Sequence, residues 1–441
     1  MIIKTNVKLL DNVDLVVAGG SATGVNAAVA AARMGLKVYI IEGQGCFGGT
    51  ATSGLVTVWH SLYGMDGKTK IISGITSEIL DALKKRNAAY TRHMDESVFE
   101  NEDMKLVLDD LIVRSKVNYL LHTLVTDVVV KNEKITGVII ENKSGRQFIR
   151  AKMFIDATGD GDLAHFAKCP YEKDKIHQPP TMCVRIANWP KNVPIGKITE
   201  AVFKPKYRKL LPLGFQWGAY SRQRKDELML AGTRVYNTDS TNGKSLSYAE
   251  VEGRCQVKVI IDILRKDVPG CKNISIAALP GHIGLRESRK IIGRYRVTGD
   301  ELLNGRSFED AIGYGSYRVD IHHGDGEGLT FYYLDGVRTK VFHSKPSVTD
   351  RWTERKDTAN FYQIPFRCML PQKINNLIVA GRAISADKKA YGALRVMVNC
   401  NQTGQAAGVA AGLCLKKNTI PSKLDYGLLR KTLKNQGAII F

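Results

Sequence analysis

No stretch of this sequence approaches the roughly 20 consecutive apolar residues that a membrane-spanning helix needs. The first ten residues are interrupted by Lys4 and Lys8, so they lack the apolar segment of a secretory signal peptide. The sequence also contains no internal repeat and no low-complexity tract. Together these absences predict a cytoplasmic protein that has no membrane partner.

Cysteine is sparse and scattered along the chain. The eight cysteines form no CxxC pair, and no group of cysteines and histidines has the spacing of a zinc site. Isolated thiols in a long chain are typical of reduced and mostly buried cysteines. We therefore expect neither a disulfide framework nor a metal site.

Acidic residues are fewer than basic residues. The chain carries 64 lysines and arginines against 43 acidic residues, which gives a formal net charge of +21. Nucleic acid, an anionic substrate or plain solubility would each account for this surplus. The charge is spread along the chain, with short clusters only at Lys84–Arg86 and Lys204–Lys209. A spread surplus favours a solvated surface, so nucleic acid is not the expected partner.

The N-terminal segment has the pattern of a βαβ unit. Apolar strands are expected at 14–18 and 37–41, on either side of an alanine-rich helix over 25–34. The loop Gly19-Gly20-Ser21-Ala22-Thr23-Gly24 joins the first strand to the helix. A pyrophosphate needs such a tight turn, a close backbone approach and the free N–H groups of a helix N-terminus. Glu42 ends the second strand, where its carboxylate would accept hydrogen bonds from ribose hydroxyls.

A second glycine-rich loop distinguishes the cofactor. Gly48–Gly54 directly follows the βαβ unit. An NAD domain has no need of a loop there, whereas in an FAD domain a loop at this point covers the pyrophosphate and the flavin. Asp156–Asp160 and Ile378–Arg382 each end a further expected strand, and Gly404–Gly408 is expected to open the last helix. The N-terminus of that helix would stabilise negative charge on a reduced flavin.

The residues between these motifs predict further regular structure. An amphipathic helix is expected over 104–112, and a meander of short strands over 119–149 leads to another strand at 153–156. A later helix is expected to open at the capping box Ser247-Tyr248-Ala249-Glu250.

A chain of 441 residues is too long for one compact core. Its two ends share apolar strands, glycine-rich loops and alanine-rich helices, and the middle lacks this pattern. The middle is richer in aromatic residues and arginines. We expect an α/β fold in which a Rossmann-type FAD-binding domain consists of residues 1–165 and 355–441. An α+β substrate domain of residues 166–354 is inserted between them.

Several blocks of the sequence together resemble one known family. The opening reads DLVVAGG…GVNAAVAAARMGLKVYIIE…GGTATSGLV and is similar to that of the bacterial FAD-dependent oxidoreductases with a GGxAT loop. The blocks IDATGDGDLA, VDIHH, YQIPFRCMLP, NNLIVAGRAISAD and RVMVNCNQTGQAAGVAA follow in the order of that family. The resemblance covers most of the chain and implies the glutathione-reductase-like flavoprotein fold with FAD as the cofactor.

The resemblance also implies a set of FAD contacts. Val125 would meet the adenine through its backbone, and Ser21 departs from the glycine that is usual in the family. The expected cofactor-binding residues are Gly19, Gly20, Ser21, Ala22, Thr23, Gly24, Glu42, Gly48, Gly49, Thr50, Ala51, Val125, Thr158, Gly159, Asp160, Gly381, Arg382, Arg395, Gly404, Gln405, Ala406 and Ala407.

Two kinds of flavoprotein chemistry lack their motifs here. Disulfide reductases of the same fold carry a CxxxxC dithiol near the second glycine loop, but Cys46 stands alone. A second strand–GxGxxG–helix unit for a nicotinamide cofactor is also absent. These absences exclude dithiol chemistry and a dedicated nicotinamide domain.

Basic residues supply the candidate catalytic groups. Hydride transfer to or from a flavin commonly needs one group that moves a proton and one cation that holds a carboxylate or carbonyl. We assign His322, Arg286 and His282 to these roles, with His60 and Arg289 as further candidates. The alternative for each is a structural residue that is hydrogen-bonded or paired with a carboxylate.

The expected function is that of an FAD-dependent oxidoreductase, a dehydrogenase or oxidase that transfers a hydride between a small organic substrate and flavin N5. The substrate would be an anionic molecule or a sugar derivative. Two alternatives stay open, namely a flavin-dependent RNA-modifying enzyme, favoured by the net charge, and a flavoprotein without turnover that serves as a scaffold or sensor. The sequence leaves the oligomeric state open.

Overall fold

The computed structural model describes residues 6–441, so the expectation drawn from the first ten residues lies partly outside it. Its central element is a seven-stranded sheet with the order β6-β2-β1-β9-β8-β7, in which β22 also pairs with β9. Five strands run parallel, and β7 and β8 add an antiparallel hairpin. The bounds are β1 Lys8–Ala18, β2 Val38–Ile41, β6 Asn118–Leu120, β7 Leu124–Lys131, β8 Lys134–Asn142, β9 Gly145–Asp156 and β22 Leu377–Val379.

The predicted βαβ unit is confirmed. Helix α1 (Ala22–Arg33) joins β1 to the parallel strand β2, and ten of its twelve residues are buried. The meander is confirmed as well, and its hairpin turn places Asn132 and Glu133 at positive φ. The segments expected as separate strands at 147–149 and 153–156 form one strand, β9, because the chain pairs with β8 over 145–150 and with β1 from 147 to 156.

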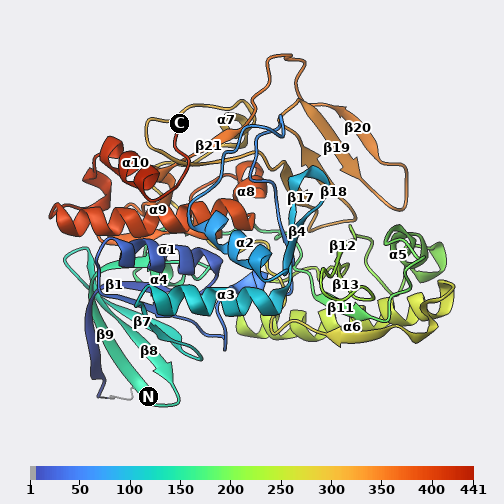
Figure 1. Cartoon of the computed structure of the whole chain (residues 1–441), viewed down its shortest axis with the longest axis horizontal. Coiled ribbons are helices and arrows are strands. Elements are labelled where there is room, and N and C mark those ends of the chain that lie inside the picture. The colour runs from blue at the N-terminus through green and yellow to red at the C-terminus, as the bar shows by residue number, and fades with distance from the viewer. Residues whose placement is uncertain (1–5) are drawn as a thin grey trace.

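The two ends of the chain meet where helix α9 (Met397–Lys416) packs along α1 (Figure 1). Gly404 and Gly408 permit this contact, because an added Cβ at either position would overlap a carbonyl oxygen of α1. The prediction that Gly404 opens the last helix is wrong, since α9 begins two turns earlier, at Met397. Around this pair lie α2 (Ile75–Lys85), α3 (Asn101–Arg114) and α10 (Tyr426–Asn435), whereas α4 (Asp162–Phe166) packs against β7 and β9.

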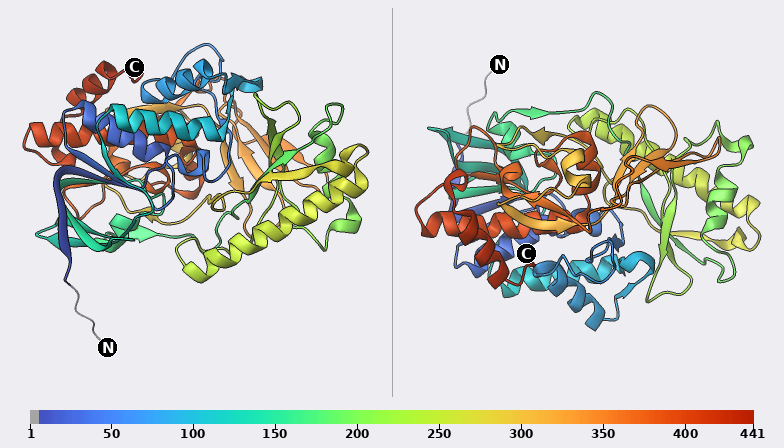
Figure 2. Two further views of the ribbon diagram at one scale, coloured as in Figure 1. Left: turned by 60° about the horizontal axis from the view of Figure 1, so that its bottom comes forward. Right: turned by 90° about the horizontal axis from the view of Figure 1, so that it is seen from above.

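A second body of structure lies beside the sheet and includes helix α6 (Gly243–Asp267), shown in yellow in Figure 2. It holds an antiparallel sheet with the order β12-β13-β11-β14 and has its own apolar core. The capping-box prediction is wrong, because Asn242 caps α6 by accepting from the Ser245 N–H at 3.0 Å. The other bounds are β11 Cys183–Ala187, α5 Gly196–Val202, β12 Trp217–Tyr220, β13 Leu228–Ala231 and β14 Ser275–Ala278.

A four-stranded antiparallel meander, β17-β18-β19-β20, and several small pairs complete the fold. The meander consists of β17 Val319–His322, β18 Leu329–Tyr332, β19 Val337–Val341 and β20 Val348–Arg351. The remaining elements are β3 Val58–Trp59, β4 Ala89–Thr91, β5 Ser97–Phe99, β10 Tyr171–Glu172, β15 Lys290–Ile291, α7 Gly299–Leu303, β16 Ala311–Gly315, β21 Tyr362–Pro365 and α8 Lys388–Leu394.

The apolar cores divide the chain near the predicted boundaries but not at them. The core beside α1 and α9 also contains Val297, Ile312 and Val319, whereas the core beneath α6 draws on residues from Met182 to Ile283. The boundaries at 166 and 354 stay a prediction, and this packing favours a shorter insert. The α/β class with a Rossmann-type sheet is confirmed.

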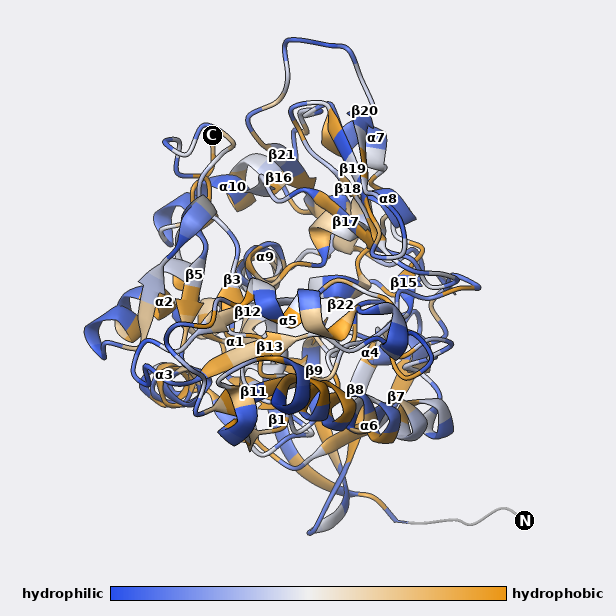
Figure 3. Ribbon diagram, turned by 90° about the vertical axis from the view of Figure 1, so that its right-hand side faces the viewer, coloured by the Kyte–Doolittle hydropathy of each residue, from blue (hydrophilic) through white to orange (hydrophobic). Residues whose placement is uncertain are grey.

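Hydrophobic residues gather on the central strands and helices, and hydrophilic residues dominate the outer loops (Figure 3). Within residues 6–441, no helix is both long enough and apolar enough to cross a membrane. The same range contains no group of three or more histidine, cysteine, aspartate or glutamate side chains that could hold a metal ion.

Candidate active site

A cavity of about 590 Å³ lies at the carboxyl ends of the parallel strands. One wall comes from the loops that follow β1, β2, β9 and β22, and the other from β11, β13, β17 and β18. In open α/β sheets, the carboxyl ends of the strands are where ligands bind. Many of the residues singled out in the sequence line this cavity.

The loop after β1 depends on glycine, because the neighbouring backbone leaves no room for a side chain. Gly19 has a φ of +94°, and an added Cβ there would overlap the carbonyl oxygen of Ala157 on the neighbouring strand end. Gly24 lies so close to Gly19 that a Cβ would overlap its carbonyl oxygen. Ser21 caps α1 with a φ of −58°, and its Oγ accepts from the Gly24 N–H at 3.4 Å. The loop therefore presents the N-terminus of α1 to the cavity, as a pyrophosphate requires.

Glu42 is fixed at the end of β2. Its Oε2 accepts from the Gly20 N–H at 2.6 Å, and its Oε1 accepts from the Gln44 N–H at 2.8 Å. The Thr123 N–H donates to the Glu42 carbonyl at 3.0 Å, which brings the start of β7 beside this acid. Val125 follows two residues later and is not a lining residue of the cavity, so its adenine contact stays a prediction.

The second glycine loop closes over the first. The Gly48 N–H donates to the Gly20 carbonyl at 2.8 Å, and Gly48 adopts a φ of +111°. Gly48, Gly49 and Thr50 line the cavity, and Asn101 holds the loop by donating from Nδ2 to the Ala51 carbonyl at 2.7 Å.

The ends of the neighbouring strands β9 and β22 are tied together where they line the cavity. Arg382 lies 2.5 Å from Oδ1 of Asp160, and both line the cavity with Thr158 and Gly159. The Gly381 N–H donates to Oγ1 of Thr403 at 2.8 Å, which anchors this turn to α9.

The residues Gly404 to Ala407 do not fulfil their predicted role at a helix N-terminus, because they lie inside α9. They are buried against neighbouring helices, and Gln405 accepts from the Ile75 N–H at 3.2 Å instead of facing the cavity. The N-terminal turn of α9 lines the cavity through Met397, Cys400 and Asn401. Both amide atoms of Asn401 are buried and lack a hydrogen-bond partner among residues 6–441, so they are available to a ligand.

His322, the first of the predicted catalytic residues, is held by protein groups on both ring nitrogens. Arg234 donates to its Nδ1 at 2.9 Å, so the neutral ring carries its proton on Nε2, which lies 3.3 Å from Oδ1 of Asp320. Burial, and then the charge of Arg286, lower the pKa of His322 to about 3. His322 is therefore neutral, with its Nδ1 occupied by Arg234 and its Nε2 beside Asp320.

Arg286 and His282 both line the cavity. The Arg286 guanidinium donates through NH1 to the Pro179 carbonyl and to Oγ1 of Thr181, each at 2.6 Å. Burial, and then the charge of Arg395, lower the pKa of Arg286 to about 9, so it stays charged at neutral pH. His282 donates from Nδ1 to the carbonyl of Ile283 at 3.1 Å.

His60 has the arrangement of a proton-transfer group. Its ring stacks on Tyr317 with 3.8 Å between centroids, and its Nδ1 lies 2.9 Å from Oε1 of Glu96. Burial alone would raise the pKa of Glu96, but the hydrogen bond with His60 and the charge of Arg92 outweigh it and lower that pKa to about 2. The ionised Glu96 fixes the His60 proton on Nδ1 and leaves the Nε2 lone pair free.

Glu96 and Arg318 are cavity residues that sequence reasoning missed, and only Arg318 has a local signal. This arginine directly precedes β17, and Arg318, Asp320 and His322 alternate along the chain, so they share the face of the strand that meets the cavity. This alternation of charged and titratable residues was the available signal. Arg289, by contrast, pairs with Asp162 at 2.8 Å and does not line the cavity, so it has the structural role.

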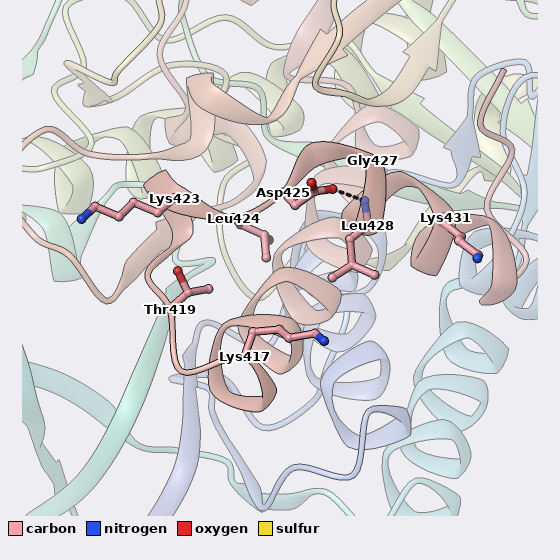
Figure 4. Close-up of a pocket in the computed structure, with 8 residues that line it drawn as sticks. All are labelled: Lys417, Thr419, Lys423, Leu424, Asp425, Gly427, Leu428 and Lys431. Carbon is pink, nitrogen blue, oxygen red and sulfur yellow. Dashed lines mark hydrogen bonds between the residues drawn. The ribbon is translucent and has the colours of Figure 1, made fainter.

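A second hollow, near the end of the chain, has a different character. It is surrounded at the surface by Lys417, Lys423 and Lys431 (Figure 4). The Asp425 carboxylate accepts a hydrogen bond from the Leu428 N–H at 2.6 Å. The three ammonium groups point in different directions, so they do not converge on a shared anion.

Comparison with known sequences identifies the family. The sequence model of the family described as FAD dependent oxidoreductase matches residues 14–433. The chain belongs to this family.

The individual relatives match the chain either over a short segment or at low sequence identity. The tRNA uridine 5-carboxymethylaminomethyl modification enzyme MnmG of Aquifex aeolicus is 31% identical over 140 residues, which cover 30% of this chain and 22% of that protein. The chain thus matches less than a quarter of the length of this curated relative. A geranylgeranyl bacteriochlorophyll reductase-like protein of Thermoplasma acidophilum has a similar structure, with 15% identity, a TM-score of 0.46, and coverage of 96% of this chain and 83% of that chain. A flavoprotein/dehydrogenase of Cytophaga hutchinsonii has 14% identity, a TM-score of 0.45, and coverage of 93% and 80%.

The cavity fits the FAD that this family uses. The N-terminus of α1 would hold the pyrophosphate, Glu42 the ribose, and the Gly48–Thr50 loop would cover both. The unpartnered amide of Asn401 lies at the end of the cavity where α9 begins, and it supplies one donor and one acceptor for a heterocyclic edge.

Proposed function

We propose that this chain is an oxidoreductase that removes a hydride from a small organic substrate in the cavity, as a dehydrogenase or oxidase. One observation carries the proposal. A single cavity joins the dinucleotide-binding loops at Gly19 and Glu42 to the His60–Glu96 pair. When bound, FAD supplies the acceptor for the hydride.

His60 is the proton acceptor in this proposal. Burial lowers the pKa of His60 below its ordinary value, against the opposing effect of Glu96, so the ring is neutral at pH 7. Its free Nε2 takes the proton from the substrate hydroxyl or amine while the carbon gives up its hydride. Glu96 then stabilises the imidazolium, and Arg92, 2.7 Å from Glu96, holds that carboxylate in place. His322 positions Asp320 and Arg234 and takes no part in proton transfer.

The decisive experiment is anaerobic mixing of the purified yellow protein with a panel of hydroxy acids, amines and sugars. We expect about one FAD per chain, released by heat or acid, and loss of the flavin absorbance with at least one donor. A protein that binds NAD instead, or takes up no nucleotide when FAD is added, would refute the proposal at its first step.

Modification of RNA is the second candidate function. The match to the tRNA-modifying MnmG and the net charge of +21 both favour it. It requires tight RNA binding that weakens steeply with salt. A filter-binding titration with bulk tRNA at two salt concentrations separates the candidates, because the small-molecule enzyme would bind weakly at both. The remaining alternative, a scaffold without turnover, fits poorly with a cavity that holds the His60–Glu96 pair.

A further inference from the structure

The charged residues of the cavity do not all have charged partners. Five arginines line it, and three of these lie within 4 Å of a carboxylate that also lines it. The pairs are Arg92 with Glu96, Arg382 with Asp160, and Arg395 with Asp320. The acids Glu42 and Glu250 accept from backbone N–H groups. Arg286 and Arg318 are left without a carboxylate within 4 Å among residues 6–441.

Arg318 is held by aromatic rings rather than by an acid. Its guanidinium carbon lies 4.2 Å from the ring centre of Phe331 and 5.1 Å from that of Tyr317. Its Nε is buried and donates no hydrogen bond to any described residue. A guanidinium stacked in this way keeps its fork of N–H groups directed sideways, free for a planar anion.

Arg286 lines the same cavity from the segment that follows β14, and the charge of Asp320 acts on both Arg286 and Arg318. Its NH1 is occupied by Pro179 and Thr181, whereas no bond from NH2 or Nε to a described residue is present. The charges of Arg395 and Arg234 act on it unfavourably and that of Asp320 favourably, so an anion bound here would relieve a net repulsion.

Apolar side chains make up much of the rest of the substrate wall, among them Phe215, Trp217, Leu246, Ile283 and Phe331, next to the polar His282, Glu250 and Asp320. We propose that Arg318 and Arg286 form a carboxylate-binding subsite for a substrate whose body is apolar, held with its reacting carbon near His60. This inference rests on the proposed function and names its substrate class.

A carboxylate fits better than a phosphate ester. Arg318 offers one planar fork, which matches the two oxygens of a carboxylate. A dianionic phosphate would bring a second negative charge into a cavity that Asp320 and Glu250 also line. The subsite is also separate from the cofactor loops, because Arg318 touches rings from the segment before β17 and from β18, not the glycine loops that follow β1 and β2.

The test uses the FAD-loaded full chain with benzoate as the probe and benzamide as a neutral probe of nearly the same shape. Benzoate is expected to perturb the flavin absorbance and to bind at least about tenfold more tightly than benzamide. Arg318→Met should weaken benzoate binding about 10- to 100-fold, because charged hydrogen bonds are lost, and leave FAD affinity unchanged. Arg318→Lys, which keeps the charge but not the fork, should lie between. Arg208→Met, which removes an exposed arginine, is the matched control.

Three outcomes would overturn the inference. Equal binding of benzoate and benzamide would show that charge is not recognised, and tighter binding of phenyl phosphate than of benzoate would make the site one for phosphate esters. A loss of FAD affinity in Arg318→Met would place that arginine on the cofactor. Should Arg318→Met fail to fold, Arg318→Lys and Arg286→Met carry the same comparison. A chain that takes up no FAD contradicts the proposed function, and calorimetric titration of that chain with benzoate still decides this inference.

Discussion

At the cofactor end of the cavity the chain presents mainly backbone, and at the substrate end it presents long side chains. Gly19, Gly24 and Gly48 bring N–H groups and carbonyls close together, and one acid, Glu42, is tied to that backbone by two hydrogen bonds. Such a site depends on the absence of side chains, because an added Cβ would meet a carbonyl oxygen at Gly19 or Gly24 and the Thr52 side chain at Gly48.

The substrate end depends on charge and on support from neighbours. His60 and Arg318 come from segments more than 250 residues apart, and each is held by a ring or an acid from a different element. Asp320 joins them, since Tyr317 donates to its Oδ2 at 3.2 Å. Burial alone would raise the pKa of Asp320, but His322 and Arg395 outweigh it and hold that pKa well below its usual range. The comparison implies that small changes of shape weaken cofactor binding, whereas small changes of charge impair the substrate end of the cavity.

The largest effect is expected at the substrate end, from His60→Gln. The variant keeps the shape of the side chain but loses the proton acceptor, so the anaerobic rate of flavin reduction should fall about 10²- to 10⁴-fold. FAD content should not change. In the wild type the rate should decline below pH 6.5, because the pKa of His60 lies under that ordinary value and only the neutral ring accepts a proton. His93→Gln, at an exposed histidine, is the control. A wild-type rate in His60→Gln would move the role to His282.

At the cofactor end, the strongest effect of a single charge is expected from Glu42→Ala. Loss of the carboxylate removes charged hydrogen bonds to the ribose and also frees the Gly20 N–H, so FAD binding should weaken by roughly 1.5–3 kcal/mol. Fluorescence titration of the apoprotein with FAD measures this. Glu141→Ala, at an exposed acid paired with Arg146, should leave the dissociation constant unchanged. An unchanged value for Glu42→Ala as well would show that the acid only braces the loop.

Gly404→Ala tests the corrected position of this glycine. The new Cβ would overlap the Thr23 carbonyl and push α9 from α1, which should lower the free energy of unfolding by about 2 kcal/mol even though alanine favours a helix. Folded protein should bind FAD with unchanged affinity. Gly243→Ala, at a helical position with nothing within 4 Å of the new Cβ, is the matched control. Unchanged stability combined with weaker FAD binding would instead favour the flavin contact predicted from the sequence.

The same contrast explains how far the sequence predicts the structure. Residues 14–42 predict their structure well, because strand, turn, helix and acid are neighbours in the chain and each has a local signature. The sequence places the start of α9 too late, because Gly404–Gly408 has the composition of a helix N-terminus beside a cofactor, whereas glycines four apart also share one helix face and permit close packing within a helix. The His60–Glu96 pair and the neighbours of Arg318 are brought together only by the tertiary fold, so no local pattern could single them out.

The smallest effect is expected at Ser21, which adds a side-chain hydroxyl to the backbone groups of the cofactor end. Its φ of −58° is one that serine adopts without strain, and its Oγ makes only a long bond of 3.4 Å with the Gly24 N–H. The hydroxyl hydrogen is therefore free to donate to a phosphate oxygen. Ser21→Ala should weaken FAD binding by on the order of 1 kcal/mol, and Ser21→Gly by a similar amount or less. Apoprotein stability separates the two roles, because loss of the cap lowers it for alanine and by only a few tenths of a kcal/mol for glycine. If Ser21→Gly tightens FAD binding, the hydroxyl crowds the pyrophosphate, and the cofactor end depends on space at this position too.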